Sequence, residues 1–517
     1  MPAVPILSPA ESEQWDVLAE EAGTSRATLM ECAGRAAAAL VCERFAVELA
    51  RGVLVAAGRG NNGGDGWVAA RALHRAGVAV WVAPVAGDRS PLCEEAAARA
   101  HREGVRDVPP EGPWPSVGLA VDALLGTGAR GAPAAALQAL TERIAELRVP
   151  VVALDGPTGV DLGTGVVHGS ARADLTITFG GFRRGHLLAR DEAGDVAVVD
   201  VGHPLPRSEW TRLVSDAWAA RRGPRLAAQA HKGERGRIVI VGGAPGMSGA
   251  LRLAARAALA AGAGYVHAVA PGQTAAELRI AEPELQTLGQ EFDAPPGGEL
   301  EALIGKADTV LVGPGLGRAD GRIELVERVA GGARRVVLDA DALVAFQGAE
   351  ARLAKLAQGT MLVLTPHPGE FRALFPDLAS ARELDPWGAA AEASKRSGAT
   401  VLLKGVPTVI GREGKAPLTV ASGNPGLGTG GSGDVLSGIL ATFLAQLDDP
   451  QLAAALAAHA LGRAADAAAR RVSARAMRPL DVVSALPEVW QQWERRRRSP
   501  VSPRPPLLAE LPRPVTA

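Results

Sequence analysis

The chain has 517 residues, too many for a single hydrophobic core, so we expect two or three domains. Hydrophobic residues make up 47% and charged residues 21%, and the formal net charge of -1 argues against nucleic acid or an anionic membrane as a partner. No apolar run approaches the roughly 18 residues that span a bilayer, and the first residues lack the features of a signal peptide. We therefore expect a cytoplasmic protein.

Short apolar runs alternate with Ala/Leu-rich helical stretches along almost the whole chain. The predicted strands of the first half are 52–58, 78–84, 117–125, 150–156 and 174–180, and those of the second half are 237–243, 264–271, 308–315, 335–341, 360–367 and 400–405. Continuous apolar strands separated by helices are typical of parallel sheets covered on both faces. The sequence therefore predicts the α/β class, with two doubly wound domains.

The boundary between the two halves is predicted within the polar segment 218–236, which is interrupted by Gly and Pro and contains no strand pattern. We assign 1–218 to the first domain and 225–493 to the second. The last residues, 494–517, combine an arginine run with many prolines, a composition that predicts a disordered tail.

The turn "GRGNNGGDG" (58–66) follows the first of these strands and opens a helix. Gly58, Gly60 and Gly63 satisfy G-x-G-x-x-G, a weak indication of a dinucleotide-binding loop. The strand at 78–84 ends without the carboxylate that holds an adenine ribose, since the next acid is Asp88, and this argues against an ordinary nicotinamide dehydrogenase. The glycines still predict backbone N–H groups that approach an anion at a helix start.

Two aspartates end later strands of the same half. Asp122 precedes the loop "LLGTGARG", and Asp155 lies in "LDGPTG". Asp122, the Asn62 side-chain oxygen and the Thr158 hydroxyl are hard oxygen ligands that could surround a cation, which leaves Asp155 for proton transfer. The alternative is that both aspartates only cap the next loop or helix.

The motifs "GNNGGDG", "DALLGTGARG" and "LDGPTG", in this order, resemble the epimerase domain of bacterial bifunctional NAD(P)H-hydrate repair enzymes, and the helix at 28–38 resembles that family's N-terminal helix. The resemblance implies a Rossmann-like domain with a potassium ion on Asn62, Asp122 and Thr158, although the family usually has serine at position 158. It implies that the hydrated dinucleotide contacts Asn61, Asn62, Gly63, Gly64, Asp65, Gly126, Thr127, Gly128, Ala129, Arg130, Gly131, Ala132 and Asp155.

The most informative motif of the second half is "GLGTGGSGDVLSGILATFL" (426–444). Its glycines direct successive backbone amides and a helix N-terminus at one point, an arrangement that stabilises transferring phosphate charge. Asp434 beside such an anion hole is electrostatically misplaced unless it removes a proton from an attacking hydroxyl. Otherwise Asp434 is simply a favourable charge at a helix start.

Other strand ends of this half also carry polar side chains. Lys404 ends the strand at 400–405 and could meet a nucleotide phosphate or simply reach solvent. His367 lies between two prolines, a rigid setting that suits ligand contact, although a lone histidine is more often structural. Asp339 and Asp341 in "LDADAL" are weaker candidates.

The motifs "HKGERGRIVIVGG", "AGAGYV", "GPGLG", "DADAL", "TPHPGE" and "GNPGLGTGGSGD" resemble, in order, the ribokinase-like ADP- or ATP-dependent NAD(P)H-hydrate dehydratase domain. The family often has methionine where Ser432 stands. The resemblance implies that Ala250, Gly315, His367 and Asp434 contact the hydrated substrate. It implies that the adenine nucleotide contacts Lys404, Gly405, Val406, Pro407, Thr408 and Gly433.

Together the two resemblances imply repair of NADH and NADPH that have added water at nicotinamide C6. The first domain would interconvert the R and S epimers with potassium bound, and Asp155 would move a proton. The second would use ADP or ATP with Mg²⁺ to dehydrate the S epimer, with Asp434 as base. We expect NADHX, NADPHX and an adenine nucleotide as small-molecule partners, and a homo-oligomer. The alternative is a ribokinase-like kinase acting on a vitamin precursor, with the first half as a ligand-binding module.

Overall fold

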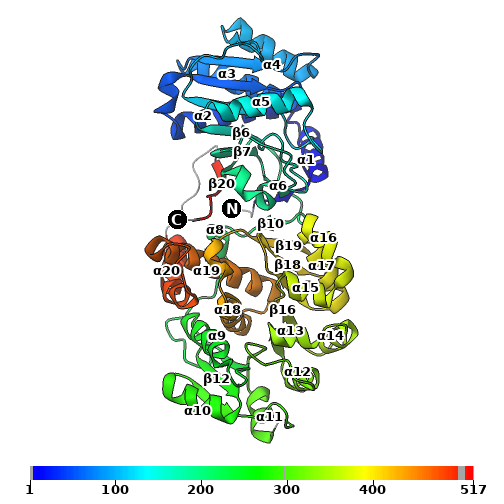
Figure 1. Ribbon diagram of the computed structural model, residues 1–517, viewed down its shortest axis with the longest axis vertical. Helices are drawn as coiled ribbons and strands as arrows, with labels where there is room; N and C mark the ends of the chain where they lie inside the picture. Colours follow the sequence, from blue (N-terminus) through cyan, green and yellow to red (C-terminus); the bar gives the residue numbers. More distant parts are fainter. Residues whose placement is uncertain (1–3, 296, 499–506, 516–517) are drawn as a thin grey trace. The chain divides into compact units, whose positions relative to one another are not determined.

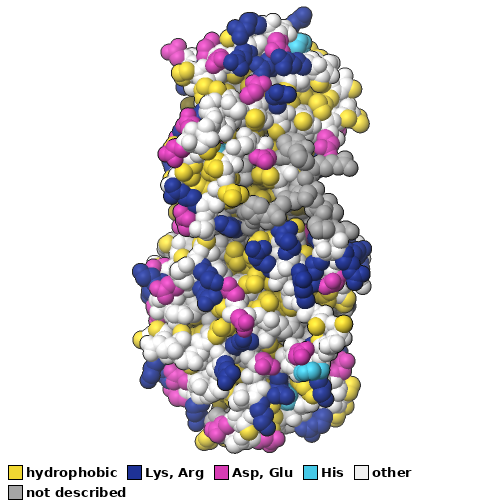
Figure 2. Space-filling model, turned by 180° about the vertical axis from the view of Figure 1, so that it is seen from behind, with side chains coloured by type: hydrophobic (Ala, Val, Ile, Leu, Met, Phe, Trp, Pro, Cys, Tyr) yellow, Lys and Arg dark blue, Asp and Glu magenta, His cyan; other side chains and the backbone are white. Residues whose placement is uncertain are grey.

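The computed structural model of the chain describes residues 4–295, 297–498 and 507–515 (Figure 1). These residues form two compact units. The N-terminal unit contains Val4–Trp210 together with residues 507–513, and the C-terminal unit begins at Thr211. None of the helices in the described ranges combines the length and apolar character of a transmembrane span. On the face shown in Figure 2, Lys and Arg side chains are interspersed with Asp and Glu, in keeping with the near-zero net charge.

The N-terminal unit is built on an eight-stranded sheet in the order β20-β9-β7-β6-β5-β2-β3-β4. All described neighbours are parallel except β20 and β9, which are antiparallel. The strands are β2 (Val53–Ala57), β3 (Val80–Pro84), β4 (Arg106–Asp107), β5 (Leu119–Ala123), β6 (Val151–Leu154), β7 (Leu175–Phe179), β9 (Asp195–Val199) and β20 (Leu507–Leu511). A separate parallel pair joins β1 (Ile6–Leu7) to β8 (Phe182–Arg183). Each predicted strand of this half is present.

Helices cover both faces of this sheet, and its central strands β2, β5, β6 and β7 are buried on both sides. Val53 and Val55 of β2 pack into the core that contains α2 (Arg26–Arg44), α3 (Asn61–Arg75) and α4 (Pro91–Arg102). Ala56 packs on the opposite face with Ile144 of α5 (Ala135–Glu146). The remaining helices of this unit are α1 (Pro9–Glu21), η1 (Glu48–Arg51), α6 (Arg184–Leu188) and α7 (Arg190–Ala193).

The strand order of the N-terminal unit reverses between β2 and β5. The chain runs outward from β2 to β3 and β4, then returns to β5 on the other side of β2. Loops that leave the carboxyl ends of strands diverge at such a point and open a crevice. Gly58 lets the loop after β2 approach β5 closely, since a Cβ there would lie 1.9 Å from the Leu124 carbonyl oxygen.

The C-terminal unit contains a ten-stranded sheet in the order β10-β19-β18-β17-β16-β15-β14-β11-β12-β13. Its described strands are parallel apart from the antiparallel pairs β17–β18 and β18–β19. They are β10 (Arg212–Leu213), β11 (Arg237–Val241), β12 (Tyr265–Ala270), β13 (Gln286–Gly289), β14 (Thr309–Val312), β15 (Arg335–Leu338), β16 (Met361–Leu364), β17 (Thr400–Leu403), β18 (Thr408–Arg412) and β19 (Lys415–Val420). All predicted strands of this half are present.

One face of this sheet packs into a large core against α8 (Asp216–Arg222), α9 (Ser248–Ala260), α18 (Ser432–Gln446), α19 (Pro450–Val472) and α20 (Pro479–Arg498). The other helices are α10 (Gly272–Ala281), α11 (Gly298–Gly305), α12 (Arg322–Gly331), α13 (Asp341–Ala345), α14 (Glu350–Ala357), α15 (Pro368–Leu374), α16 (Ala379–Leu384) and α17 (Pro386–Ser397), with η2 (Pro376–Leu378) and η3 (Pro425–Gly428). The predicted class, α/β with two doubly wound domains, is confirmed.

The C-terminal sheet repeats the reversal of the N-terminal one, here between β11 and β14. Glycine again permits the close approach of the two loops, because a Cβ at Gly242 would lie 2.1 Å from the Pro314 carbonyl oxygen. Each unit therefore has a strand-order reversal of the kind at which ligands of doubly wound proteins bind.

Two predicted limits differ from the structure. The first domain was predicted to end at 218, but residues from Thr211 group with the C-terminal unit, because β10 pairs with β19. The segment 494–517 was predicted to be disordered, but α20 continues to Arg498 and β20 adds an antiparallel strand to β9. Residues 499–506 and 516–517 of that segment lie outside the described ranges.

Candidate functional sites

A cleft of about 670 Å³ lies at the carboxyl ends of the strands in the N-terminal unit. It brings together most of the residues predicted to contact the dinucleotide. Those that line it are Asn61, Asn62, Asp65, Gly126, Thr127, Gly128, Ala129, Arg130 and Asp155. Gly63, Gly64, Gly131 and Ala132 are not among the described residues that line it. Gly64 serves packing instead, since a Cβ there would lie 2.5 Å from the Met30 side chain of α2.

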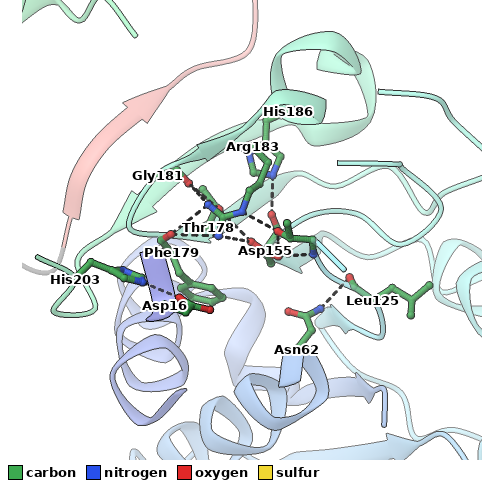
Figure 3. A network of polar contacts seen from close by, with 11 residues as sticks. Asp16, Asn62, Leu125, Asp155, Thr178, Phe179, Gly181, Arg183, His186 and His203 are labelled. Atoms are coloured by element: carbon green, nitrogen blue, oxygen red, sulfur yellow. Dashed lines mark hydrogen bonds and ion pairs between the residues drawn. The ribbon is translucent and has the colours of Figure 1, made fainter. Parts of the chain in front are cut away.

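Asp155 lines this cleft, and both its carboxylate oxygens have partners (Figure 3). Oδ2 accepts hydrogen bonds from the backbone N–H of Thr127 (2.7 Å) and from its hydroxyl (2.5 Å). Oδ1 forms an ion pair with the Arg183 guanidinium at 3.1 Å, and the Thr178 hydroxyl also donates to it (3.3 Å). The Arg183 Nε in turn donates to the Thr127 hydroxyl (2.7 Å).

The backbone of Asp155 is held in a strained conformation. Its φ of 59° is in the left-handed region, which a non-glycine residue rarely adopts. Its N–H donates to the Ile177 carbonyl oxygen (2.8 Å). Its carbonyl oxygen lies 2.6 Å from Nε2 of His186. Because Nδ1 of His186 accepts the Arg183 N–H (3.0 Å), Nε2 carries the proton and donates to Asp155. Strain that neighbours enforce in this way is typical of functional sites.

The charges around Asp155 decide its ionisation. Burial favours the neutral acid, but the Arg183 charge and the Thr127 hydrogen bonds outweigh it, and the pKa of Asp155 is lowered. Burial also lowers the pKa of His186, to about 4, so this imidazole is neutral at pH 7. Asp155 is therefore a carboxylate, able to accept a proton from a bound molecule. By contrast, burial raises the pKa of the neighbouring Asp65 well above its ordinary value, with the charge of Asp155 contributing.

The oxygen atoms predicted to hold a cation lie next to the cleft. The Asn62 amide donates through Nδ2 to the Leu125 carbonyl oxygen (3.0 Å), and its buried Oδ1 has no hydrogen-bond partner among the described residues. Asp122 is fully buried and accepts hydrogen bonds from the Thr158 N–H and hydroxyl, both at 2.7 Å. Burial raises the pKa of Asp122 despite these bonds. An unsatisfied oxygen and a buried carboxylate would both be stabilised by a cation.

Sequence reasoning missed several residues of this site. Arg183 and His186, which hold Asp155, come from "FRRGH" directly after β7. At another part of the cleft wall, Asp16 of α1 pairs with His203 at 2.9 Å (Figure 3). Arg183 and His186 follow a strand end, and this position was a signal that the sequence offered. The pairing of Asp16 with His203 joins residues 187 positions apart, so no local pattern indicates it.

In the C-terminal unit, the glycine loop is fixed at its start by a buried carboxylate of α19. Asp466 accepts hydrogen bonds from the Gly423 N–H (3.4 Å) and from the Asn424 amide (3.3 Å), and Arg463 pairs with it at 3.4 Å. The loop then leads into α18, which begins at Ser432, so that Asp434 lies in its first turn as predicted.

Lys404 lies in a cluster of acids at the strand ends. Its Nζ donates to Asp339 (2.9 Å) and lies 3.8 Å from a Glu370 carboxylate oxygen. Burial opposes its charge, but Asp339 and Glu370 outweigh burial, so the pKa of Lys404 is raised. Gly433 lies beside this cluster, since a Cβ there would be 3.5 Å from Nζ of Lys404. Between Asp339 and Asp341, Ala340 has a φ of 48°, a second left-handed non-glycine residue at a site.

The pKa of Asp434 is shifted in the opposite direction to that of Asp155. Burial raises the pKa of Asp434 to about 7; the negative charge of Asp339 adds to this and Lys404 opposes it. Lys404 compensates Asp434 poorly because its ammonium is hydrogen-bonded to Asp339. A carboxyl group with this pKa can both accept and release a proton near neutral pH, as general acid–base catalysis requires.

The other predicted residues of this unit lie after several different strands of the sheet. Gly315 lies against α9, with a hypothetical Cβ 3.4 Å from the Ala250 Cβ. His367 caps α15, and its Nδ1 accepts the Gly369 N–H at 2.9 Å while the side chain stays half exposed. Gly405, Val406 and Pro407 lie in the turn between β17 and β18, and Thr408 is the first residue of β18. Val406 is 78% exposed. Gly405 and Val406 are exposed, whereas Pro407 is buried.

Comparison with known proteins gives matches to both units. Residues 26–185 match the family described as YjeF-related protein N-terminus, and residues 238–488 match the family described as NAD(P)H-hydrate dehydratase. The bifunctional NAD(P)H-hydrate repair enzyme of Escherichia coli K12 is 35% identical over 501 residues, covering 93% of this chain and 92% of that enzyme. The enzyme of the same name from Salinibacter ruber is 36% identical over 522 residues, covering 91% of this chain and 93% of that enzyme.

Among solved structures, the ADP/ATP-dependent NAD(P)H-hydrate dehydratase from Bacillus subtilis, co-crystallised with ATP/Mg²⁺, is similar to the chain with a TM-score of 0.46. It is 24% identical and covers 54% of this chain and 97% of its own.

The raised pKa of Asp434 predicts a pH-dependent stability. The folded protein retains this proton at pH values where the unfolded chain, with a pKa near 3.8, releases it. The stability from this group is thus complete below about pH 4 and is lost as the pH rises through about 7. Relative to wild type, we expect Asp434→Asn to gain about 2 kcal/mol more at pH 8 than at pH 5, since each pKa unit corresponds to about 1.4 kcal/mol. Urea unfolding of the full chain measures this.

The matched control is Asp320→Asn, which removes an exposed carboxylate of the same unit. Its difference from wild type should be the same at both pH values. A gain for Asp434→Asn that does not change with pH would contradict the raised pKa.

Proposed function

The chain belongs to the family of bifunctional NAD(P)H-hydrate repair enzymes, and from this premise we propose how its two sites divide the work. It epimerises R and S NAD(P)H-hydrate, and it dehydrates the S epimer at the expense of ADP or ATP to regenerate NAD(P)H. The observation that supports our assignment of roles is the opposite tuning of two aspartates at strand-end crevices: Asp155 is held ionised, and Asp434 has a pKa of about 7.

In the N-terminal unit we assign Asp155 as the group that takes and returns a proton during epimerisation. A carboxylate that is ionised at neutral pH can accept a proton from a bound molecule, and Arg183 and Thr127 hold its two oxygens in fixed positions. The amides at the start of α3 and the loop 126–130 would bind the phosphates and nicotinamide part of the dinucleotide. His186 would position Asp155 through its carbonyl oxygen without exchanging a proton, since it is neutral.

A potassium ion fits the oxygen atoms beside this cleft. Asn62 offers the unsatisfied Oδ1, while Asp122 and Thr158 supply a buried carboxylate and a hydroxyl. When bound, the ion would supply positive charge that fixes these groups and keeps Asp122 ionised.

In the C-terminal unit, Asp434 would take the proton of the C6 hydroxyl as the hydroxyl oxygen attacks the terminal phosphorus of ADP or ATP. The bond between that phosphorus and its bridging oxygen breaks, and the nucleotide leaves one phosphate shorter. The attack forms a bond between the C6 oxygen and phosphorus. The C6–O bond then breaks, phosphate leaves with its electron pair, and loss of a ring proton from C5 restores the double bond. Phosphate is a far better leaving group than hydroxide, which explains why the dehydration consumes a nucleotide. Amides of the loop 426–434 would stabilise the transferring phosphoryl group.

Magnesium would bind in this unit together with the nucleotide. Asp339 and Glu370 lie 2.9 and 3.8 Å from the single ammonium of Lys404, and Asp434 adds negative charge near it, which favours binding of a cation. The described residues contain no group of three or more His, Cys, Asp or Glu side chains close enough to hold a metal by themselves. The ion would supply charge neutralisation on the phosphates.

The alternative, a vitamin-precursor kinase with an N-terminal binding module, is disfavoured by the relatives named as repair enzymes over at least 91% of the chain. The cytoplasmic location and the homo-oligomer stay predictions.

The division of roles predicts opposite losses from two isosteric substitutions. Asp155→Asn should lower the rate at which the R epimer is consumed by about 100-fold or more, because general acid–base groups contribute rate enhancements of that order. Repair of the S epimer with ADP or ATP should remain. The measurement is recovery of reduced-nicotinamide absorbance, together with chromatographic separation of the two epimers.

Asp434→Asn is the reciprocal control, which should epimerise normally and fail to dehydrate either epimer. Equal R-epimer consumption by Asp155→Asn and wild type would sink the assignment of Asp155.

Potassium removal should affect one activity only. Replacing KCl by choline chloride at equal ionic strength, without added Na⁺, should lower the epimerisation rate by about tenfold or more, the loss expected when one charge-assisted contact of roughly 1.4 kcal/mol or more disappears. Thr158→Val should lose most of the response to K⁺, because it removes one ligand oxygen. Dehydration of the S epimer serves as the internal control. Identical epimerisation rates in K⁺ and choline would rule out the potassium site.

A further inference from the structure

Arg59 is a basic residue of the cleft with no role assigned so far. It lies between β2 and α3, two residues before the helix begins at Asn61, and it lines the cleft while staying exposed. Within the described part of the chain, its guanidinium forms no ion pair and no hydrogen bond, whereas the nearby Arg89 pairs with Glu94 at 2.8 Å. An unpaired cation on the wall of a nucleotide cleft is free to bind an anionic group of the ligand.

Arg59 extends over the carboxyl end of β3. The Ser90 N–H donates to its carbonyl oxygen (2.8 Å), which ties the loop after β3 to the loop after β2. Its guanidinium lies against Gly87, where a Cβ would come within 2.9 Å of a guanidinium nitrogen. Gly87 also has a φ of 107°, so any larger residue there would be strained and would displace the guanidinium.

The topology determines which part of the dinucleotide reaches this position. If the nicotinamide part lies at Asp155 after β6 and the pyrophosphate lies at the start of α3, the adenosine extends in the opposite direction, over β3. In doubly wound dinucleotide sites, a carboxylate at this strand end binds the ribose 2′-hydroxyl, and an arginine there accommodates a 2′-phosphate. The cleft presents Val85 and Arg59 at this end, whereas Asp88 is exposed and is not among the described residues that line it.

We propose that Arg59 binds the 2′-phosphate of the adenosine ribose, and that the epimerase site therefore prefers hydrated NADPH over hydrated NADH. This inference rests on the proposed epimerase function of the cleft. Arg59 determines specificity and is no catalytic residue, because it lies at the adenosine end of the cleft and Asp155 at the other.

A guanidinium at this position could also bind the pyrophosphate, which both substrates share. A comparison of the two substrates distinguishes binding of the 2′-phosphate from binding of the pyrophosphate. Epimerisation of purified R-NADPHX and R-NADHX is followed by chromatography without ADP or ATP, so that dehydration does not consume the product. The full-length wild type is compared with Arg59→Gln and with Arg102→Gln, which removes an exposed arginine at the end of α4, outside the cleft.

Wild type should show the higher kcat/KM for R-NADPHX. Arg59→Gln should lower that value by about tenfold or more, the loss typical of one hydrogen bond to a charged group, and change kcat/KM for R-NADHX by less than about twofold. Arg102→Gln should leave both values unchanged. Equal losses for both substrates would assign Arg59 to the pyrophosphate and overturn the proposal, as would no loss for either.

A second readout does not depend on the identity of the reaction. Adenosine 2′,5′-bisphosphate should bind the wild-type chain more tightly than 5′-AMP, and Arg59→Gln should reduce that difference by about tenfold. Dissociation constants from calorimetry measure it, with Arg102→Gln as control. If wild type epimerises neither substrate but this difference in affinity depends on Arg59, the assignment of epimerase function to the cleft is wrong, and the assignment of Arg59 to the 2′-phosphate is retained. If the difference is unaffected by Arg59→Gln, the phosphate site is wrong.

Discussion

A carboxylate that leaves water must find compensating charge or hydrogen bonds, or it will hold its proton. Both units place such a carboxylate at the crevice of a doubly wound sheet, and they compensate it differently. Arg183 and Thr127 satisfy both oxygens of Asp155, which therefore stays ionised despite its burial. Lys404 stands near Asp434 but is hydrogen-bonded to Asp339, so the pKa of Asp434 rises to about 7. One residue type thus performs two kinds of proton chemistry.

Topology explains why each carboxylate lies beside a ligand crevice. In both sheets the strand order reverses in the interior of the sheet, between β2 and β5 and between β11 and β14. At each reversal one glycine permits the two loops to touch, Gly58 against Leu124 and Gly242 against Pro314. The polar ends of the neighbouring strands then meet around the opening. In each unit one residue next to the reaction site, Asp155 or Ala340, has a left-handed backbone that its neighbours must enforce. The residues for ligand binding and for proton transfer therefore lie in and next to loops that a buried sheet holds in place.

Local patterns predicted much of this arrangement. The apolar runs located the central strands, and the glycine turns located Asp155 and Asp434, because strand periodicity and turn chemistry depend on neighbouring residues. The partners of those aspartates were beyond local reasoning, since Thr127 and Asp155 are 28 residues apart and Lys404 and Asp339 are 65 apart. The same limit hid β20, whose partner β9 lies some 300 residues earlier and whose proline-rich surroundings suggested disorder. Likewise, the two-residue strand β10 is defined only by its pairing with β19, which is distant in the sequence.

The ionisation states of the two aspartates are the central claim, and isotope-edited infrared spectroscopy tests them most directly. Full-length protein labelled with ¹³C in its aspartate carboxyl groups is compared at pH 6 with labelled Asp155→Asn and Asp434→Asn. The account predicts that Asp434→Asn removes intensity from the protonated carboxylic acid band, and that Asp155→Asn removes intensity only from the carboxylate band. Loss of acid-band intensity in Asp155→Asn, or its retention in Asp434→Asn, would contradict the account.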